Sequence, residues 1–232
     1  MPTGASRDRA SYFVMDPAPS GAVPTLNRMS TESRPLRVVA VSGSLTAPSR
    51  TTALVEAIAE SFGRALPVES HLITLNALGP HLAGALTRKE LPAEAEAELQ
   101  RIENADLLIV ATPVYRASFT GLFKHLFDFV DQYALVDTPV LLAATGGSER
   151  HALIIEHQLR PLFGFFQSLA LPVGVYAHDS DFTDYTISNA QLTERIEKAI
   201  ARALPLVRSS LVEKETVERA LAGEDVSSTP EG

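Results

Sequence analysis

Hydroxyl-bearing residues and one arginine follow a short apolar run near the start of the patterned sequence. A strand expected over 36–41 ends there, and a helical pattern begins at Arg50. The first amide groups of a helix lack partners within the helix, and the positive end of its dipole attracts anions. The polar residues at this point are Ser42, Ser44, Ser49, Arg50 and Thr51. We therefore interpret the segment as a phosphate-binding loop, although an ordinary serine-capped helix is the simpler alternative.

Two further loops combine a turn with residues that suit a flat ligand. The first consists of Thr112, Pro113, Val114 and Tyr115, and the second of Thr145, Gly146 and Gly147. Proline fixes a turn, tyrosine offers a ring or a hydroxyl, and glycine lets the backbone approach a ligand where a Cβ would collide. Taken alone, the glycine pair is equally well explained as a plain strand-to-helix turn.

Strands and helices are expected to alternate along the chain and so to bring these loops together. Apolar runs predict strands over 36–41, 68–75, 106–111, 139–144 and 173–177. Periodicity predicts helices over 50–66, 92–104, about 119–130, 149–169 and 188–207, with a loop over 76–91. The alternation indicates an α/β fold: a flavodoxin-like three-layer sandwich with a five-stranded parallel sheet of order 2-1-3-4-5. Ligands of such sheets bind at the carboxyl ends of the strands, where all three loops would lie.

The helix over 119–130 carries an apolar stripe that predicts either core packing or a subunit interface. Its members recur at helical spacing and are Phe119, Leu122, Phe123, Leu126, Phe127 and Val130. Because the stripe is larger than one sheet face needs, we expect a homo-dimer or homo-tetramer.

Pro161 lies inside the helix predicted over 149–169. Proline has no N–H group, so the carbonyl group of His157 loses its partner within the helix. We therefore predict a kink or a π-bulge near this point. A partly buried histidine without a special role is the simpler interpretation of His157, and His151 is a weaker candidate for a nearby site.

The patterned sequence occupies part of the 232 residues. Residues 1–34 are rich in proline, serine and threonine and are expected to be a disordered leader or an over-extended start. Residues 35–207 are predicted to form the flavodoxin-like domain. Residues 208–232 are expected to be an acidic C-terminal tail, part of it a short exposed helix.

Composition argues against several classes of protein. The net charge of −8 disfavours a nucleic-acid partner, and the lack of a long apolar run disfavours a membrane partner and favours the cytoplasm. With no cysteine, the chain offers no disulfide, thiolate nucleophile or cysteine-bound zinc. Its six histidines lack metal-binding spacing, so we expect no metal site, and no Gly-x-Ser-x-Gly motif indicates a hydrolase.

Sulfur is confined to the beginning of the sequence. The three methionines are Met1, Met15 and Met29, so the chain from Thr31 onward contains no sulfur atom. Chance or avoidance of oxidation would explain this distribution. A more specific hypothesis is that the protein is made in quantity when sulfur is scarce.

Taken together, the three loops resemble those of the NADPH-dependent FMN reductase family. Within that family, the chain is similar to the FMN reductases of bacterial alkanesulfonate and methanesulfonate monooxygenase systems, over about residues 36–205. The resemblance rests on Ser42-Gly43-Ser44 with Ser49-Arg50-Thr51, on Ala111-Thr112-Pro113-Val114-Tyr115, on Gly121-Leu122-Phe123-Lys124 with Asp128, and on Ala144-Thr145-Gly146-Gly147.

The resemblance implies roles for these residues. Ser44, Ser49, Arg50 and Thr51 would hold the FMN phosphate, Thr112 to Tyr115 would border the isoalloxazine and ribityl groups, and Thr145 to Gly147 would flank the pyrimidine side. Hydride would pass between stacked rings, so no residue is expected to be a catalytic acid or base. Lys124 and Asp128 are expected to serve packing or an exposed ion pair. His157 would match a residue, tyrosine in better-known members, that lies in a π-helix at a tetramer interface beside the flavin.

The function implied is an NAD(P)H-dependent FMN reductase that supplies reduced FMN to an FMNH2-dependent monooxygenase in sulfonate desulfurisation. The sequence has no Gly-x-Gly-x-x-Gly motif and does not separate NADH from NADPH, while the resemblance favours NADH. One alternative is a tight FMN-binding electron carrier or redox-sensing flavoprotein. Another is a quinone, azo-dye or metal-oxyanion reductase with FMN as a fixed prosthetic group.

Overall fold

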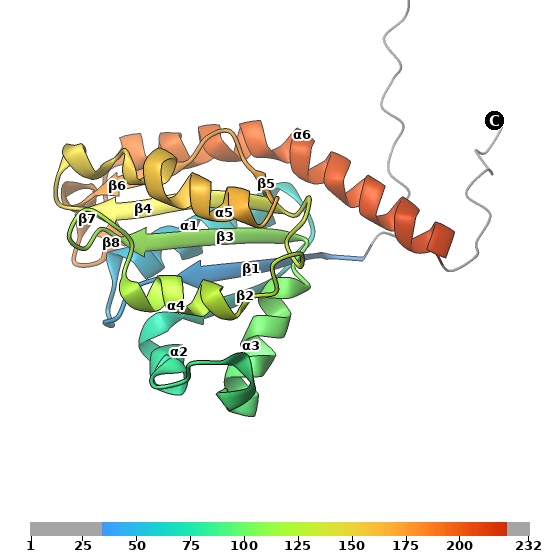
Figure 1. Ribbon diagram of the computed structural model, residues 1–232. Coiled ribbons are helices and arrows are strands. Elements are labelled where there is room, and N and C mark those ends of the chain that lie inside the picture. Colours follow the sequence, from blue (N-terminus) through green and yellow to red (C-terminus); the bar gives the residue numbers. More distant parts are fainter. Residues whose placement is uncertain (1–33, 222–232) are drawn as a thin grey trace, which may run out of the picture. The chain divides into compact units, whose positions relative to one another are not determined.

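The computed structural model describes residues 34–221 and arranges them as a sheet between two helical layers (Figure 1). All neighbouring strands of the sheet run parallel, in the order β2-β1-β3-β4-β5, with β6 also paired to β4. The predicted flavodoxin-like order is confirmed. The strands are β1 (Leu36–Ser42), β2 (Val68–Thr74), β3 (Leu107–Pro113), β4 (Pro139–Gly146), β5 (Leu169–Ala170) and β6 (Val175–His178).

The fifth position of the sheet differs from the prediction of one strand over 173–177. It is shared by β5 and β6, which pair with the beginning and the end of β4. Pro172 lies between them, and a proline cannot donate to the hydrogen-bond ladder of a sheet. The predicted strand began after Pro172, so it corresponds to β6, and the two-residue β5 before the proline was missed.

The helices cover both faces of the sheet. Alternate residues of the buried strands point to opposite faces, so Val38 packs toward α1 and α6, and Val39 toward the other helices. The elements are α1 (Arg50–Ala65), α2 (Leu75–Leu82), α3 (Ala93–Glu103), α4 (Gly121–Phe129), the π-helix η3 (Ile155–Leu159), α5 (Arg160–Phe165) and α6 (Ala190–Leu221), with short 3-10 turns η1 (Arg88–Glu90), η2 (Glu149–His151) and η4 (Asp179–Asp181) and a hairpin of β7 (Phe182–Thr183) and β8 (Thr186–Ile187).

The apolar stripe over 119–130 belongs to the core. Phe123, Leu126 and Phe127 are fully or almost fully buried. The ring of Phe127 meets that of Phe163 edge-on, with 4.9 Å between the ring centroids. Of the two predicted uses of the stripe, the structure shows core packing.

The prediction of a loop over 76–91 was wrong. Helix α2 occupies Leu75–Leu82, and η1 follows at Arg88–Glu90. The leucines at 75, 78 and 82 have helical spacing and are buried, and this burial outweighs the glycine and proline that suggested a loop.

The last helix is also longer than the predicted range of 188–207. Helix α6 continues to Leu221. Lys214, beyond the predicted end, pairs with the fully buried carboxylate of Asp106 at 3.1 Å. This ion pair joins residues far apart in sequence, which explains why the local periodicity did not reveal the extension of the helix. Residues 1–33 of the leader expected over 1–34, and residues 222–232 of the tail, lie outside the described residues.

Pro161 has the predicted effect on its helix. The single helix expected over 149–169 is divided into η2, the π-helix η3 and α5. The N–H group of Arg160 donates to the carbonyl oxygen of Ile155, five residues earlier, which defines the π-turn. The π-bulge predicted next to Pro161 is thereby confirmed.

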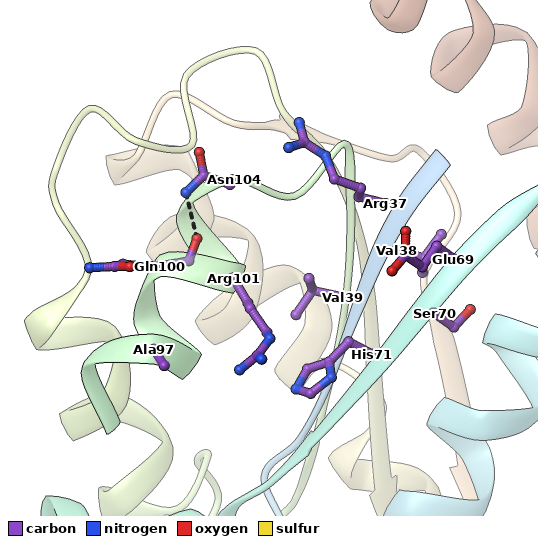
Figure 2. Close-up of a pocket in the computed structure, with 10 residues that line it drawn as sticks. All are labelled: Arg37, Val38, Val39, Glu69, Ser70, His71, Ala97, Gln100, Arg101 and Asn104. Carbon is purple, nitrogen blue, oxygen red and sulfur yellow. Dashed lines mark hydrogen bonds between the residues drawn. The ribbon is translucent and has the colours of Figure 1, made fainter. Parts of the chain in front are cut away.

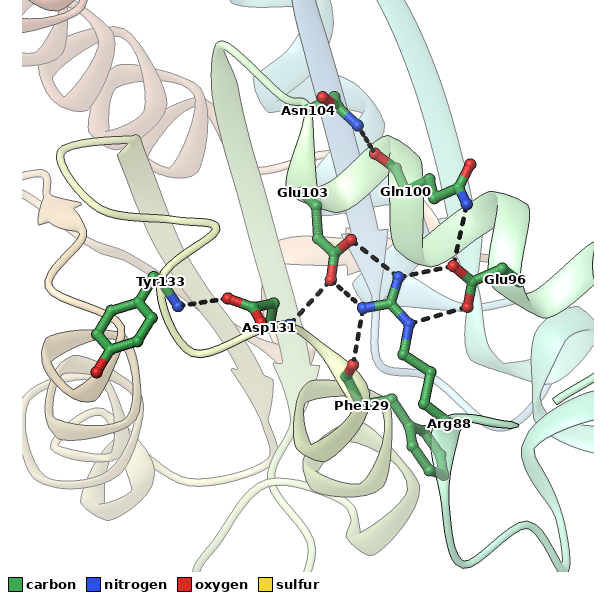
Figure 3. A network of polar contacts seen from close by, with 8 residues as sticks. All are labelled: Arg88, Glu96, Gln100, Glu103, Asn104, Phe129, Asp131 and Tyr133. Carbon is green, nitrogen blue, oxygen red and sulfur yellow. Dashed lines mark hydrogen bonds and ion pairs between the residues drawn. The ribbon is translucent and has the colours of Figure 1, made fainter. Parts of the chain in front are cut away.

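Arg88 ties the segment after α2 to two other helices (Figure 3). Its guanidinium makes paired hydrogen bonds to Glu96 and Glu103 of α3, with Nη2 2.7 Å from the carboxylate of Glu96. It also donates to the carbonyl oxygen of Phe129 at the end of α4, at 3.3 Å. These carboxylates raise the pKa of Arg88, and its guanidinium lowers the pKa of Glu96. The cluster fixes α3 against α4.

Candidate functional site

The three predicted loops meet in one cleft at the carboxyl edge of the sheet. Strand pairing places Pro113 of β3 beside Thr145 of β4, and Ser42 of β1 beside Ala111 of β3. The cleft has a volume of about 320 Å³, within the size range of small-molecule sites, roughly 300–1,000 Å³. It is lined by Ser44, Thr46, Pro48, Ser49, Arg50, Thr51, Pro113, Val114, Tyr115, Thr145, Gly146, Gly147, Asp179 and Tyr185.

One end of the cleft is the N-terminus of α1. Ser49 caps this helix: its Oγ accepts hydrogen bonds from the N–H groups of Thr51 and Thr52, at 3.1 and 3.3 Å. Ser44 is buried, and its Oγ donates to the carbonyl oxygen of Thr46 at 3.0 Å. Arg50 supplies the positive charge. A helix start, hydroxyl groups and a guanidinium together form an environment for an anion.

Hydrogen bonds between the loops fix this arrangement. The hydroxyl groups of Thr51 and Thr145 lie 2.7 Å apart and join the first turn of α1 to the end of β4. The N–H group of Val114 donates to the carbonyl oxygen of Thr145 at 2.9 Å. Thr120, the N-cap of α4, donates through Oγ1 to the carbonyl oxygen of Gly43 at 3.2 Å. The loops therefore hold one another in place through protein contacts alone.

Two of the predicted site residues lie below the cleft. Ser42 and Thr112 are fully buried and do not line it. The hydroxyl of Ser42 is 2.8 Å from that of Thr52, and the hydroxyl of Thr112 donates to the carbonyl oxygen of Pro113 at 3.0 Å. Their side chains support the loops from within. The other predicted cofactor-binding residues all line the cleft.

The glycine turn at the end of β4 has little room for side chains. A Cβ on Gly146 would lie 2.7 Å from the hydroxyl oxygen of Tyr176, and one on Gly147 would lie 3.0 Å from Oδ2 of Asp179. The hydroxyl of Tyr176 donates to the carbonyl oxygen of Ser148 at 2.7 Å. Burial raises the pKa of Tyr176, so this donor keeps its proton at neutral pH. Tyr176 thus positions the turn from below.

Sequence reasoning missed four lining residues: Thr46, Pro48, Asp179 and Tyr185. Thr46 and Pro48 belong to the predicted phosphate loop and could have been included. Asp179 directly follows β6 and so reaches the ligand-binding edge of the sheet. Tyr185 lies in the turn between β7 and β8, two strands too short to leave a pattern.

Two tight turns beside the cleft use left-handed backbone at residues other than glycine. In one, Tyr115 and Ser118 exchange backbone hydrogen bonds around Arg116 and Ala117, whose φ angles are 50° and 66°. In the other, Asp184 and Tyr185 have φ angles of 46° and 67°. Such conformations cost roughly 1–2 kcal/mol per residue and cluster at functional sites.

Comparison with known proteins identifies the family. The family model described as NADPH-dependent FMN reductase matches residues 36–183. The chain belongs to this family. It is 60% identical over 179 residues to the NADH-dependent FMN reductase SfnF of Pseudomonas fluorescens (strain Pf0-1), covering 77% of this chain and 96% of that one. It is 55% identical to an FMN reductase (NADPH) of Pseudomonas aeruginosa, covering 74% and 92% of the two chains.

A solved structure agrees with this assignment. An oxidoreductase from Corynebacterium diphtheriae superimposes with a TM-score of 0.69 and 33% identity, covering 76% of this chain and 99% of that one. The resemblance seen in the sequence is confirmed at the level of the FMN reductase family.

The residues of the cleft fit FMN. The capped start of α1 and Arg50 suit its phosphate, and the glycine turn leaves the backbone free of side chains on the opposite side. Tyr115 and Tyr185 are the aromatic residues that line the described cleft, and they are 47% and 45% exposed. An FMN reductase of this shape would hold its flavin without a buried aromatic sandwich.

His157 lies in the π-helix, as expected, but outside the cleft. It is exposed and lines a smaller pocket of about 170 Å³ with His151 and Val114. Val114 also lines the cleft, so the two spaces are neighbours. Nδ1 of His151 is buried and has no hydrogen-bond partner among the described residues.

A larger groove of about 610 Å³ lies elsewhere, between β1, β2 and α3 (Figure 2). None of the predicted loops lines it. Its basic side chains contact carboxylates: Arg37 contacts Asp106, and both His71 and Arg101 contact Glu98. The residues that line it include neither a helix start nor the glycine turn of the cleft, so it is not the predicted site.

Among the described residues, no three or more histidine, aspartate or glutamate side chains lie close enough together to hold a metal ion. No helix in this part of the chain is long and apolar enough to cross a membrane. Lys124 and Asp128 form an exposed ion pair along α4, as the sequence predicted.

Proposed function

We propose that this protein reduces FMN with NADH or NADPH and releases the reduced FMN to a partner monooxygenase. The reductase activity follows from family membership: the chain is an NAD(P)H-dependent FMN reductase. The observation that carries the proposal is the cleft itself, which joins the capped start of α1, Arg50 and a glycine turn at the carboxyl edge of the sheet. We place the reaction in the cytoplasm, where nicotinamide reductants are made.

The chain's contribution is binding and orientation. When bound, FMN supplies a ring that accepts hydride from the nicotinamide. Ser44, Ser49, Arg50 and Thr51 are assigned to the phosphate, and Pro113, Val114 and Tyr115 to the ring and ribityl chain. The backbone amide groups of Thr145, Gly146 and Gly147 are assigned to the pyrimidine edge, on which reduction builds negative charge. Ser42 and Thr112 act on these loops from below rather than by direct contact.

Release of the product is favoured by the openness of the site. Arg50 is exposed, and both tyrosines of the cleft are nearly half exposed. A tight electron carrier would be expected to enclose its flavin more completely. The geometry therefore favours FMN as a substrate that leaves over FMN as a fixed prosthetic group.

The partner is proposed to act on sulfonates during sulfur limitation. One support is the absence of sulfur from the chain after Met29. The other is the likeness to the SfnF and SfnE reductases, which share 60% and 58% identity with it over the matched regions. Those two relatives are named NADH-dependent, whereas the P. aeruginosa relative is named for NADPH. We favour NADH for this chain.

We further propose that the protein is a homo-dimer or homo-tetramer. The core stripe of α4 no longer supports this, because it is buried within the chain. The support comes from Leu153 and Phe165, next to the π-helix, which are 61% and 65% exposed. Sedimentation of wild type and Phe165→Ser tests it: a smaller assembly is expected for the variant, and a monomeric wild type would refute it.

Reduction followed by rapid separation tests release. Protein loaded with FMN is reduced anaerobically with NADH and passed through a desalting column. We expect the reduced flavin to elute apart from the protein. Co-elution of reduced FMN with the protein in a one-to-one ratio would instead support the carrier or fixed-cofactor alternatives.

A further inference from the structure

A carboxylate shares the phosphate end of the cleft with Arg50. Asp179 follows β6 and reaches the same edge of the sheet as the α1 loop. Its Oδ1 lies 3.3 Å from Nη1 of Arg50. Both residues line the cleft together with Ser44 and Ser49. An anion that binds there meets a cation that already has a carboxylate partner.

The turn that carries Asp179 is held by other residues. The neighbouring Asp181 is buried and accepts hydrogen bonds from the N–H group of His178 at 2.9 Å and from Arg195 at 2.6 Å. The side chain of Asp179 takes no part in these bonds and is 48% exposed. The turn is therefore held without the contact between Asp179 and Arg50.

Tyr185 keeps the guanidinium near this carboxylate. The Cζ atom of Arg50 lies 5.7 Å from the centre of the Tyr185 ring, within reach of a cation–π contact. A guanidinium that contacts both a ring and a carboxylate has a stable position without any ligand. A bound phosphate must compete with that position.

We propose that Asp179 competes with the phosphate of FMN for Arg50 and thereby weakens flavin retention. Arg50 exchanges one anionic partner for the other as FMN binds and leaves. Asp179 is then a positioning residue for release, and this inference rests on the proposed function, in which FMN must depart after reduction. Like charges held a few ångströms apart in a half-exposed site repel enough to change affinity about fivefold to twentyfold.

Flavin binding by the Asp179→Asn variant tests the proposal. The substitution keeps the shape of the side chain and removes its charge. We expect the dissociation constant of FMN to fall about fivefold to twentyfold and the FMN dissociation rate to fall with it, as measured by flavin fluorescence and stopped flow. Riboflavin lacks the phosphate, so its dissociation constant should change less than about twofold.

Two further variants serve as controls. Asp179→Glu retains the charge and should not show the tighter FMN binding. Asp184→Asn removes an exposed carboxylate from the adjacent hairpin and should leave both flavin affinities within about twofold of wild type. These comparisons separate a specific effect at Arg50 from a general change of surface charge.

The proposal is overturned if Asp179→Asn weakens FMN binding, leaves it unchanged, or shifts FMN and riboflavin equally. The first result would mean that Asp179 aims Arg50 at the phosphate, and the last would mean that it only stabilises the turn. Binding is measured without a nicotinamide. If the protein binds FMN but does not oxidise NADH or NADPH, the proposed function is refuted. The FMN affinities of wild type and Asp179→Asn still show whether Asp179 weakens flavin binding.

Discussion

Arg50 is the positively charged residue among those that line the described cleft. Its proposed role is to bind the phosphate of FMN. The hydroxyl groups around it are partly committed to protein contacts, as with Thr51 and Thr145 at 2.7 Å. The N–H groups of Thr51 and Thr52 are likewise bonded to Ser49 Oγ, so we expect discrimination between FMN and riboflavin to depend mainly on Arg50. The sequence revealed this residue because it stands at a helix start after a strand. Its partner Asp179 was missed because an aspartate in a short polar segment has no distinctive local signal.

Replacing Arg50 should separate the two flavins. Charge-assisted hydrogen bonds contribute about 1.5–3 kcal/mol, so Arg50→Met should raise the dissociation constant of FMN by about tenfold or more. Riboflavin binding should stay nearly constant. Fluorescence titration measures both, and Arg64→Met, at the other end of α1, is the matched control. Equal losses for both flavins would show that Arg50 does not contact the phosphate.

Gly146 should be intolerant of even a methyl group. In Gly146→Ala the new Cβ would meet the hydroxyl of Tyr176, whose hydrogen bond to Ser148 would have to shift. We expect a loss of about 1–3 kcal/mol in the free energy of unfolding, together with weaker FMN binding.

Gly164→Ala is the control for that substitution, because a Cβ at this position in α5 meets open space. It should be neutral or stabilise the protein by up to about 1 kcal/mol. Equal stability of the two alanine variants in urea denaturation would show that the turn has room for a side chain.

At the scale of elements, the sequence predicted the parts that depend on local pattern. The buried strands β1, β3 and β4 were found from apolar runs, and the π-helix from the missing N–H group of Pro161. Elements held by distant contacts were missed. The end of α6 depends on an ion pair with Asp106, more than a hundred residues away, and β5 has only two residues. The leucines of α2 have helical spacing, but the segment also contains a glycine and a proline. These two residues led to the prediction of a loop.

The contacts of Arg88 should stabilise the packing of α3 against α4. Arg88→Met would leave Glu96 and Glu103 without their shared guanidinium, and we expect a loss of about 1–3 kcal/mol in urea-induced unfolding. Lys124→Met removes one partner of an exposed pair in α4 and should cost less than about 1 kcal/mol. If both variants lost the same small amount, Arg88 would be no more than a surface residue.

The same cluster should make stability depend on pH. The hydrogen bond from Arg88 lowers the pKa of Glu96 below its ordinary value of 4.5. Its contribution is therefore present above about pH 4.5 and is lost as the pH falls through the lowered pKa. Denaturation at several pH values should show the difference between wild type and Arg88→Met shrinking in acid. A difference that stays constant down to pH 3 would show that Glu96 is not involved.

At the scale of the molecule, the parallel sheet explains why residues from four separate loops come together at one site, to which the turn between β7 and β8 adds Tyr185. Each loop follows a strand of the same direction, so all reach one edge. The sequence predicted this convergence for three loops and missed the fourth, which carries Asp179. The distribution of charge and apolar surface is less predictable, because it depends on packing. Thus the stripe of α4 entered the core, while Phe165 remained exposed.

Steady-state oxidation of NADH and NADPH by purified, flavin-free protein, with FMN or riboflavin as the varied substrate, tests the account most directly. We predict saturable turnover that requires added flavin, favours NADH, and has a lower KM for FMN than for riboflavin. Stoichiometric FMN binding without turnover would contradict the account and would support a carrier or a sensor instead.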